Sequence, residues 1–163
     1  MIKENIKNQI VESARIKNEM VTNGVAEIEK AAELLIECVN SGGTIYWCGN
    51  GGSAADAQHL STELMGGMGD NDRMPIPSIA LTTDSSFITA WSNDTDFDSV
   101  FSRQIQGLGK EGDVLIGIST SGNSKNIINA IKQAKYKKLK TITFTGRSGG
   151  KLDGIADITI KIP

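Results

Sequence analysis

The stretch "DVLIGISTSGNSKNIINAIKQAKYK", residues 113–137, holds the pattern that decides the fold. Its first seven residues, "DVLIGIS", form a continuous apolar run of the kind found in strands buried on both faces of a parallel sheet. From about Asn123 to Lys137 the apolar positions follow the period of a helix. Between strand and helix stands a cluster of hydroxyl side chains: Ser119, Thr120, Ser121 and Ser124. The stretch therefore predicts a strand, a polar loop and a helix in direct succession.

Strand and helix patterns alternate in the same way from residue 43 onward. This alternation predicts an α/β fold with a parallel sheet and helices on both of its faces. We expect five strands, at about residues 44–48, 77–81, 113–118, 140–144 and 157–162. Two helical patterns precede the first strand and should either cover one face of the sheet or form an interface between subunits. The chain should be a single domain, 1–163, with N-terminal helices in 1–41 and an α/β core in 42–163.

Further helices are expected between the strands, beginning at about Ser53, within "SSFITAWSND" and within "TDFDSVFSRQIQGLG". The pattern of the second is weak, whereas the third has Asp96 or Asp98 near its start, where a carboxylate accepts free backbone N–H groups. The segment "RSGGKLDGIA" is expected to form a loop or a short turn.

The composition is that of a globular protein of 163 residues, 39% hydrophobic and 22% charged. A net charge of −2 leaves no general basic surface, so nucleic acid is not an expected partner. No apolar run approaches the roughly 18 residues of a membrane span, and the N-terminus lacks the apolar segment of a signal peptide. Cys38 and Cys48 make no disulfide framework and are expected to be reduced and mostly buried. These features favour a soluble, cytoplasmic protein with no membrane partner.

A second loop, Gly49-Asn50-Gly51-Gly52-Ser53, also stands between a strand pattern and a helix pattern. Free N–H groups at a helix N-terminus, close backbone approach at glycines and neutral hydroxyl donors together suit a phosphate group. Neither loop has the GxxxxGK[ST] spacing of nucleotide hydrolases or the GxGxxG of dinucleotide-binding folds. A single phosphate on a small metabolite fits best. The alternative is that these serines and glycines only cap helices and form turns.

His59, the only histidine, stands about one helical turn from two carboxylates in "DAQHLSTEL". Asp56, His59 and Glu63 fall on one helix face, where His and Glu can share a metal ion or act as an acid and a base. A hydrogen-bonded surface pair is the alternative. Because this helix starts at the glycine loop, we expect Glu63 about two turns from a phosphate held there, which suits the far end of a phosphorylated sugar.

The turn "SNDTDFD", residues 92–98, is rich in amide and carboxylate side chains. It lacks the ligand spacing and the glycine of an EF-hand, so a calcium loop is excluded. Asp94 belongs either to a solvated turn or to the site, where it would orient a sugar hydroxyl or a catalytic group.

Three long segments resemble a known family: "CGNGGSAADAQHLSTEL", "ALTTDSSFITAWSNDTDFDSVFSRQIQGLGKEGDVLIGISTSGNS" and "TFTGRSGGKLDGIADITIKIP". They are similar, in this order, to the sugar isomerase (SIS) domain and, within it, to the phosphoheptose isomerases. The resemblance runs from about residue 24 to the last residue. It implies a three-layer α/β/α sandwich of flavodoxin-like type and a homotetramer with active sites between subunits. It also implies conversion of sedoheptulose 7-phosphate to D-glycero-D-manno-heptose 7-phosphate through an enediol(ate), the first step of nucleotide-heptose biosynthesis.

Carried over by position, the resemblance implies a role for each residue singled out above. The implied phosphate-binding residues are Ser53, Ser119, Thr120, Ser121 and Ser124. Asn50 and Asp94 would contact the sugar, with Gly51 and Gly52 lining the substrate site. Glu63 would be the catalytic acid/base and His59 a catalytic zinc ligand, with Glu63 close enough to bind the same zinc ion.

The sequence departs from the family pattern in two places. Gly67 stands where the family often has a basic residue. The family also continues into a C-terminal helix that supplies a Gln and a His, whereas this sequence ends at Pro163, so we expect that helix to be missing and the zinc ligand set to be incomplete. An alternative is a non-catalytic phosphosugar-binding or partner-binding SIS protein, like the relative that associates with the replication initiator. That relative departs at the position of Glu63, so Glu63 favours the enzyme.

Overall fold

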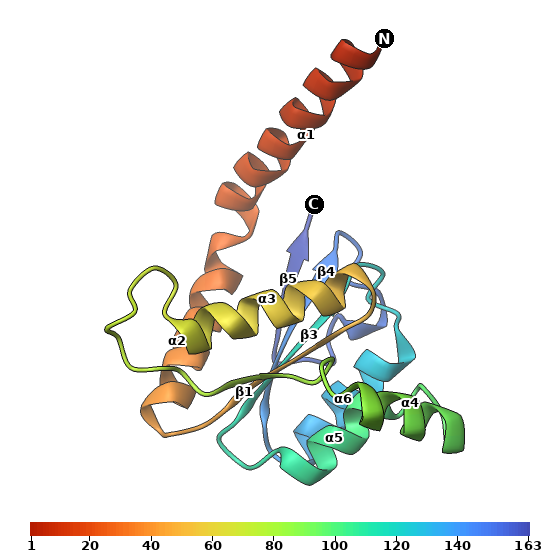
Figure 1. The fold of residues 1–163 in the computed structure, drawn as a ribbon. Helices are drawn as coiled ribbons and strands as arrows, with labels where there is room; N and C mark the ends of the chain where they lie inside the picture. The colour runs from red at the N-terminus through yellow and green to blue at the C-terminus, as the bar shows by residue number, and fades with distance from the viewer.

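The computed structural model describes residues 1–163, and its centre is a five-stranded parallel sheet (Figure 1). The strands are β1 (Ile45–Gly49), β2 (Ser78–Ala80), β3 (Val114–Ser119), β4 (Lys140–Gly146) and β5 (Ile158–Ile162). Their order across the sheet is β2-β1-β3-β4-β5, and every neighbouring pair is parallel. Chain order reverses between β1 and β3, as in flavodoxin-like sheets. The predicted fold class is confirmed, and each strand lies close to its predicted range.

Helices cover both faces of this sheet. They are α1 (Ile2–Asn23), α2 (Val25–Asn40), α3 (Gly52–Gly66), α4 (Ser85–Asp94), α5 (Val100–Leu108) and α6 (Lys125–Tyr136). Ile45 and Trp47 of β1 pack in the same core as residues of α2 and α3, whereas Tyr46 and Cys48 pack with α5 and α6. Successive side chains of a strand point to opposite faces, so one strand serves two cores. This explains why β3, which is buried at every position, is an unbroken apolar run.

Short polar contacts fix the starts of the two helices in the middle of the chain. At α4, the Asp84 carboxylate accepts the Phe87 N–H at 2.9 Å, which supports a helix whose apolar pattern is weak. Before α5, the Asp96 carboxylate accepts the Ser99 N–H at 2.6 Å, in agreement with the predicted role of this aspartate. The segment expected to be a loop or a short turn contains one 3₁₀ turn, Gly150–Leu152.

The two cysteines are buried free thiols, as the sequence predicts. Cys48 lies on β1 in the core beneath α5 and α6, and burial raises the pKa of its thiol. A thiol that stays protonated is a poor nucleophile, so Cys48 serves packing and not chemistry.

Helix α1 projects away from the sheet, beyond the ends of the strands (Figure 1). It contains no buried residue, whereas α2 packs against β5. Although α1 is the longest helix, neither it nor any other has the length and apolar character needed to cross a membrane. Of the two roles expected for the N-terminal helices, α2 covers the sheet and α1 leaves its surface exposed.

Candidate functional site

The two loops predicted to bind phosphate lie at the switch point of the sheet. The glycine loop, residues 49–53, follows β1 and leads into α3 on one face of the sheet. The loop with the four hydroxyl side chains, residues 119–124 and called the hydroxyl loop below, follows β3 and leads into α6 on the other face. β1 and β3 are neighbours, with Gly49 in register with Ile118. In open α/β sheets this crevice between diverging loops is where ligands bind.

The four hydroxyls of the second loop are not equivalent. The Ser119 and Ser124 hydroxyls are 3.0 Å apart and hydrogen-bond to each other, and Ser119 is buried. Ser121 is exposed, and its Oγ accepts the backbone N–H of Asn123 at 3.1 Å. Thr120 is exposed, and its hydroxyl makes no hydrogen bond within the chain. Thr120 therefore has a free hydroxyl for a ligand, whereas Ser119 and Ser124 share one bond.

A cavity of about 480 Å³ opens between α3 and the carboxyl ends of β3 and β4. Ser53, His59 and Thr120 line it, and the side chains of these three residues make no hydrogen bond within the chain. Its wall also includes Thr145, whose hydroxyl is buried without a partner. Three predicted site residues, two from α3 and one from the loop after β3, thus meet at one cavity with their polar atoms free.

Glu63 lies outside that cavity, further along α3. It is half-buried, and its carboxylate makes no ion pair or hydrogen bond within the chain. The helix rise between Ser53 and Glu63 is about 15 Å, closer to three turns than the two expected from the sequence. His59 and Glu63 remain one turn apart, but no third His, Cys, Asp or Glu joins them to form a possible metal site.

The resemblance implies that Asp94 and Asn50 contact the sugar, but neither side chain lies at this cavity. Asp94 is exposed at the last residue of α4, does not line the cavity, and accepts a hydrogen bond from the Asn93 amide at 2.8 Å. The Asn50 side chain is hydrogen-bonded to Asn126 of α6. Neither side chain meets Ser53, His59 and Thr120 at the cavity within this one subunit.

A third loop, residues 146–152, braces the hydroxyl loop from behind. The Gly146 N–H donates to the Thr120 carbonyl at 2.9 Å, and the Leu152 N–H donates to the Gly122 carbonyl at 3.0 Å. Gly122 has a φ of +64°, and a Cβ there would collide with the Gly149 carbonyl. This contact between residues 146–152 and the hydroxyl loop was not predicted, although two adjacent glycines between strands indicate a close backbone approach.

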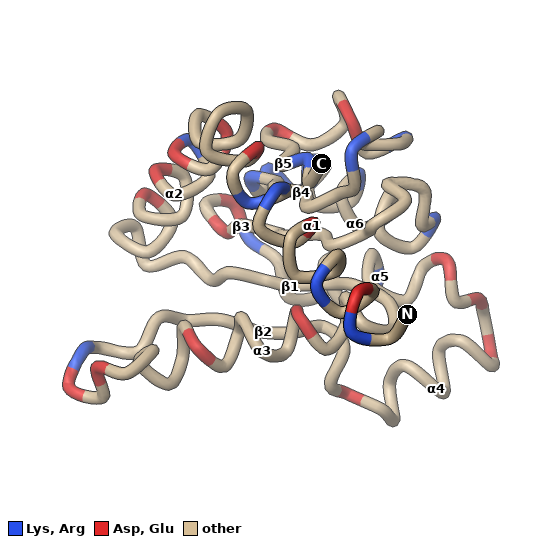
Figure 2. The backbone as a smooth tube through the Cα atoms, turned by 90° about the horizontal axis from the view of Figure 1, so that it is seen from above, with Lys and Arg blue, Asp and Glu red and all other residues tan.

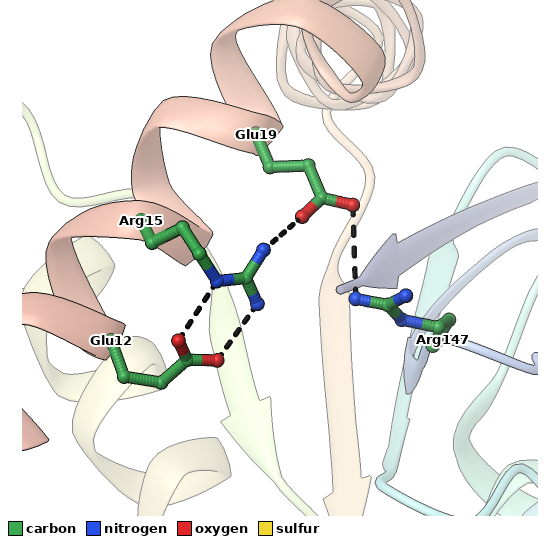
Figure 3. A network of polar contacts seen from close by, with 4 residues as sticks. All are labelled: Glu12, Arg15, Glu19 and Arg147. Carbon is green, nitrogen blue, oxygen red and sulfur yellow. Dashed lines mark hydrogen bonds and ion pairs between the residues drawn. The ribbon is translucent and has the colours of Figure 1, made fainter.

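Several Lys and Arg positions lie along the backbone around β4 and β5 (Figure 2). One of them, Arg147, directly follows the cavity-lining Gly146 and contacts Glu19 of α1 at 3.8 Å. Glu19 also accepts from Arg15 at 2.6 Å, and Arg15 in turn binds Glu12 (Figure 3). The charged side of α1 therefore contacts the residue that follows β4, and the Glu19 carboxylate offsets part of the Arg147 charge there.

Comparison with known proteins shows the family to which the chain belongs. The family described as the SIS domain matches residues 10–146. The phosphoheptose isomerase of Sulfurimonas denitrificans is 48% identical over 99% of this chain and 84% of that protein. The chain belongs to the SIS domain family, among its phosphoheptose isomerases.

Solved structures of this family have the same fold. The phosphoheptose isomerase GmhA from Neisseria gonorrhoeae superposes with a TM-score of 0.93 at 44% identity, covering 100% of this chain and 86% of that one. A phosphoheptose isomerase from Francisella tularensis gives a TM-score of 0.95 at 36% identity, with the same coverage. The resemblance stated from the sequence motifs is confirmed.

The structure gives a physical reason for one departure from the family pattern. Gly67 ends α3 with a φ of +118°, and a Cβ there would run into the Asp70 carbonyl. A basic side chain at this position would require a different backbone. Instead, Arg73 donates from Nη2 to the carbonyls of Glu63 and Leu64, both at 2.8 Å, and so stabilises the end of the helix that carries the Glu63 carboxylate.

Proposed function

We propose that this protein is an aldose–ketose isomerase acting on sedoheptulose 7-phosphate. The observation that carries the proposal is the presence of free hydroxyls at the cavity beside α3 and of a free carboxylate further along the same helix. The cavity presents the uncommitted side chains of Ser53 and Thr120, and Glu63 of the same helix has no partner in the chain. The phosphoheptose isomerases named above support the choice of substrate.

In the proposed reaction, Glu63 moves a proton between two adjacent carbon atoms. Its carboxylate takes a proton from C1 of the ketose, and the electron pair forms the C1–C2 double bond of the enediol(ate). The same carboxyl group returns the proton at C2 while the proton of the C1 hydroxyl passes to the C2 oxygen, which leaves the aldehyde at C1 and a hydroxyl at C2. Because the Glu63 carboxylate makes no ion pair or hydrogen bond within the chain, its oxygens are available to accept the proton. The phosphate group, held by hydroxyls and backbone N–H groups at the helix N-termini, fixes the distance between the sugar chain and this base.

For zinc, the described residues offer only two candidate ligands, His59 and Glu63. Together they supply two donors, whereas catalytic zinc sites normally use three protein ligands. These residues alone do not fit a zinc site, and the proton transfer above runs through Glu63 without it. If the assembled protein binds zinc through these two side chains, calorimetric titration with zinc should detect binding that His59→Ala abolishes. Equal zinc binding by wild type and His59→Ala would show that His59 is not a zinc ligand.

The proposal includes a homotetramer with active sites completed between subunits, in the cytoplasm. Two features support a shared site: Asp94 lies away from the cavity within one subunit, and α1 leaves an apolar face uncovered. The two buried free thiols are in keeping with a reducing compartment.

The decisive experiment is an assay of aldose formation from sedoheptulose 7-phosphate. Wild type should form the aldose, and Glu63→Gln should lower kcat by about a thousandfold because it removes the base. Glu29→Gln, which removes an exposed carboxylate of α2, is the matched control and should retain full activity. Wild-type protein that binds the sugar phosphate but forms no aldose would sink the enzyme proposal and leave a phosphosugar-binding protein.

A further inference from the structure

The glycine loop and the hydroxyl loop are joined by a reciprocal pair of side-chain amides. The Nδ2 of Asn50 donates to the Oδ1 of Asn126 at 2.9 Å, and the Nδ2 of Asn126 donates to the Oδ1 of Asn50 at 2.8 Å. The two residues are 76 positions apart in the chain and come from different strand–helix units. This pair is a direct link across the switch point of the sheet.

Asn126 is held rigidly on its own side of the link. It lies in the first turn of α6 with only 3% of its surface exposed, and its Oδ1 also accepts the Ile127 N–H at 3.0 Å. Its neighbours Ile127 and Ile128 are buried in the core. A buried amide is costly unless it is hydrogen-bonded, so an apolar residue would serve packing alone at least as well as asparagine here.

The pair also limits what Asn50 can do for a ligand. Asn126 uses one N–H and one lone pair of the Asn50 amide, which leaves one amide hydrogen and one lone pair of Oδ1 for any other partner. The position of Asn50 determines where Gly51, Gly52 and Ser53 begin α3. Asn126 therefore fixes this helix start relative to Ser119 and Ser124, which precede α6.

Resting on the proposed function, we infer that Asn126 is a positioning residue: it acts through Asn50 to set the spacing between the two loops that grip the phosphate. It touches neither the reacting carbon atoms nor Glu63. Loss of the link should therefore weaken binding of the phosphate group and raise KM, while kcat changes much less.

The test compares Asn126→Leu with Asn129→Leu. Asn129, on the same helix, donates to the Asp98 carbonyl at 3.0 Å and does not contact Asn50, so its substitution removes a comparable hydrogen bond elsewhere. Asn126→Leu should raise KM for sedoheptulose 7-phosphate about tenfold or more and weaken binding of inorganic phosphate similarly, with kcat within about threefold of wild type. Asn129→Leu should lower the melting temperature about as much as Asn126→Leu does, but it should leave KM unchanged. If Asn126→Leu does not fold, Asn126→Ser takes its place with the same expectation.

A double substitution separates positioning from direct contact. If the amides act as one unit, Asn50→Ala should raise KM to the same extent as loss of Asn126, and the double variant should be no worse than either single one. Additive effects, or an unchanged KM in the Asn126 variants, would overturn the inference. Phosphate binding keeps the two proposals distinct: if wild type forms no aldose but loses phosphate affinity on substitution of Asn126, only the proposed function fails.

Discussion

The side chains around the cavity differ in how many of their hydrogen bonds remain available. Ser53, His59 and Thr120 make none within the chain, whereas Ser119 and Ser124 bond to each other. Such differences follow from side-chain orientation at the ends of two strands. The sequence predicts that Ser53, Thr120 and the other loop hydroxyls follow the ends of strands, but it contains no signal for which hydroxyl is paired and which is free.

Thr145 offers a test of hydrogen-bond satisfaction at the cavity wall. It is 2% exposed, and its hydroxyl has no hydrogen-bond partner. Because an unsatisfied buried hydroxyl costs about 1–3 kcal/mol, the nearly isosteric Thr145→Val should raise the free energy of unfolding by about 1 kcal/mol. Urea denaturation of the two proteins measures the difference.

Thr143, two residues earlier on β4, is the matched control for this substitution. It is fully buried, and its hydroxyl hydrogen-bonds to that of Thr159 at 3.0 Å. Thr143→Val should therefore lower the free energy of unfolding by about 1 kcal/mol. A loss of the same size in Thr145→Val would mean that the Thr145 hydroxyl has a partner, such as an ordered water molecule.

At the scale of elements, periodicity and breakers in the sequence predict all five strands and all six α-helices. Strands that are buried on both faces of a parallel sheet have successive apolar residues, and this made β3 easy to predict. What could not be predicted were contacts between distant segments: the brace of residues 146–152 behind the hydroxyl loop, and the link between Asn50 and Asn126. These depend on strand order, which no local pattern encodes.

The start of the edge strand β5 is attached to the sheet through Asp157. Its Oδ2 accepts both the N–H and the hydroxyl of Thr141 at 2.8 Å, and its Oδ1 accepts from Lys135 at 3.1 Å. Burial by itself would raise the pKa of Asp157, but the Thr141 hydrogen bonds and the Lys135 charge together outweigh it and lower this pKa.

This pKa shift predicts how stability depends on acidity. Because the pKa of Asp157 is lower in the folded protein than in the unfolded chain, its contribution is present above the unfolded pKa of about 4 and is lost as pH falls through the folded pKa. Asp157→Asn should therefore be less stable than wild type at pH 7, and the difference should shrink at pH 3, as measured by thermal unfolding. Asp153→Asn, which removes an exposed ion pair with Lys161, should have little effect at either pH. A gap of equal size at both pH values would show that charge on Asp157 does not matter.

At the scale of the whole molecule, α1 is the element that a single chain does not explain. Residues Glu12, Arg15 and Glu19 lie on the side that reaches Arg147 (Figure 3). Ile6 and Ile10, one turn apart, lie on the other side and are 55% and 65% exposed. A helix with a charged side toward its own subunit and an apolar side toward solvent is suited to packing against copies of itself.

We therefore expect that glutamates on the apolar side of α1 will break up the proposed tetramer. Burial of each isoleucine stabilises an interface by about 2 kcal/mol, and a buried glutamate opposes it, so Ile6→Glu with Ile10→Glu should dissociate four copies of the 17.4 kDa chain into smaller species. Light scattering measures the mass of the assembly. If active sites are completed between subunits, the rate of aldose formation should fall when this mass falls. Asn5→Glu with Asn8→Glu adds the same charge on the polar side of α1 and should leave both mass and activity unchanged. If the isoleucine variant keeps the mass of wild type, α1 is not the surface through which subunits associate.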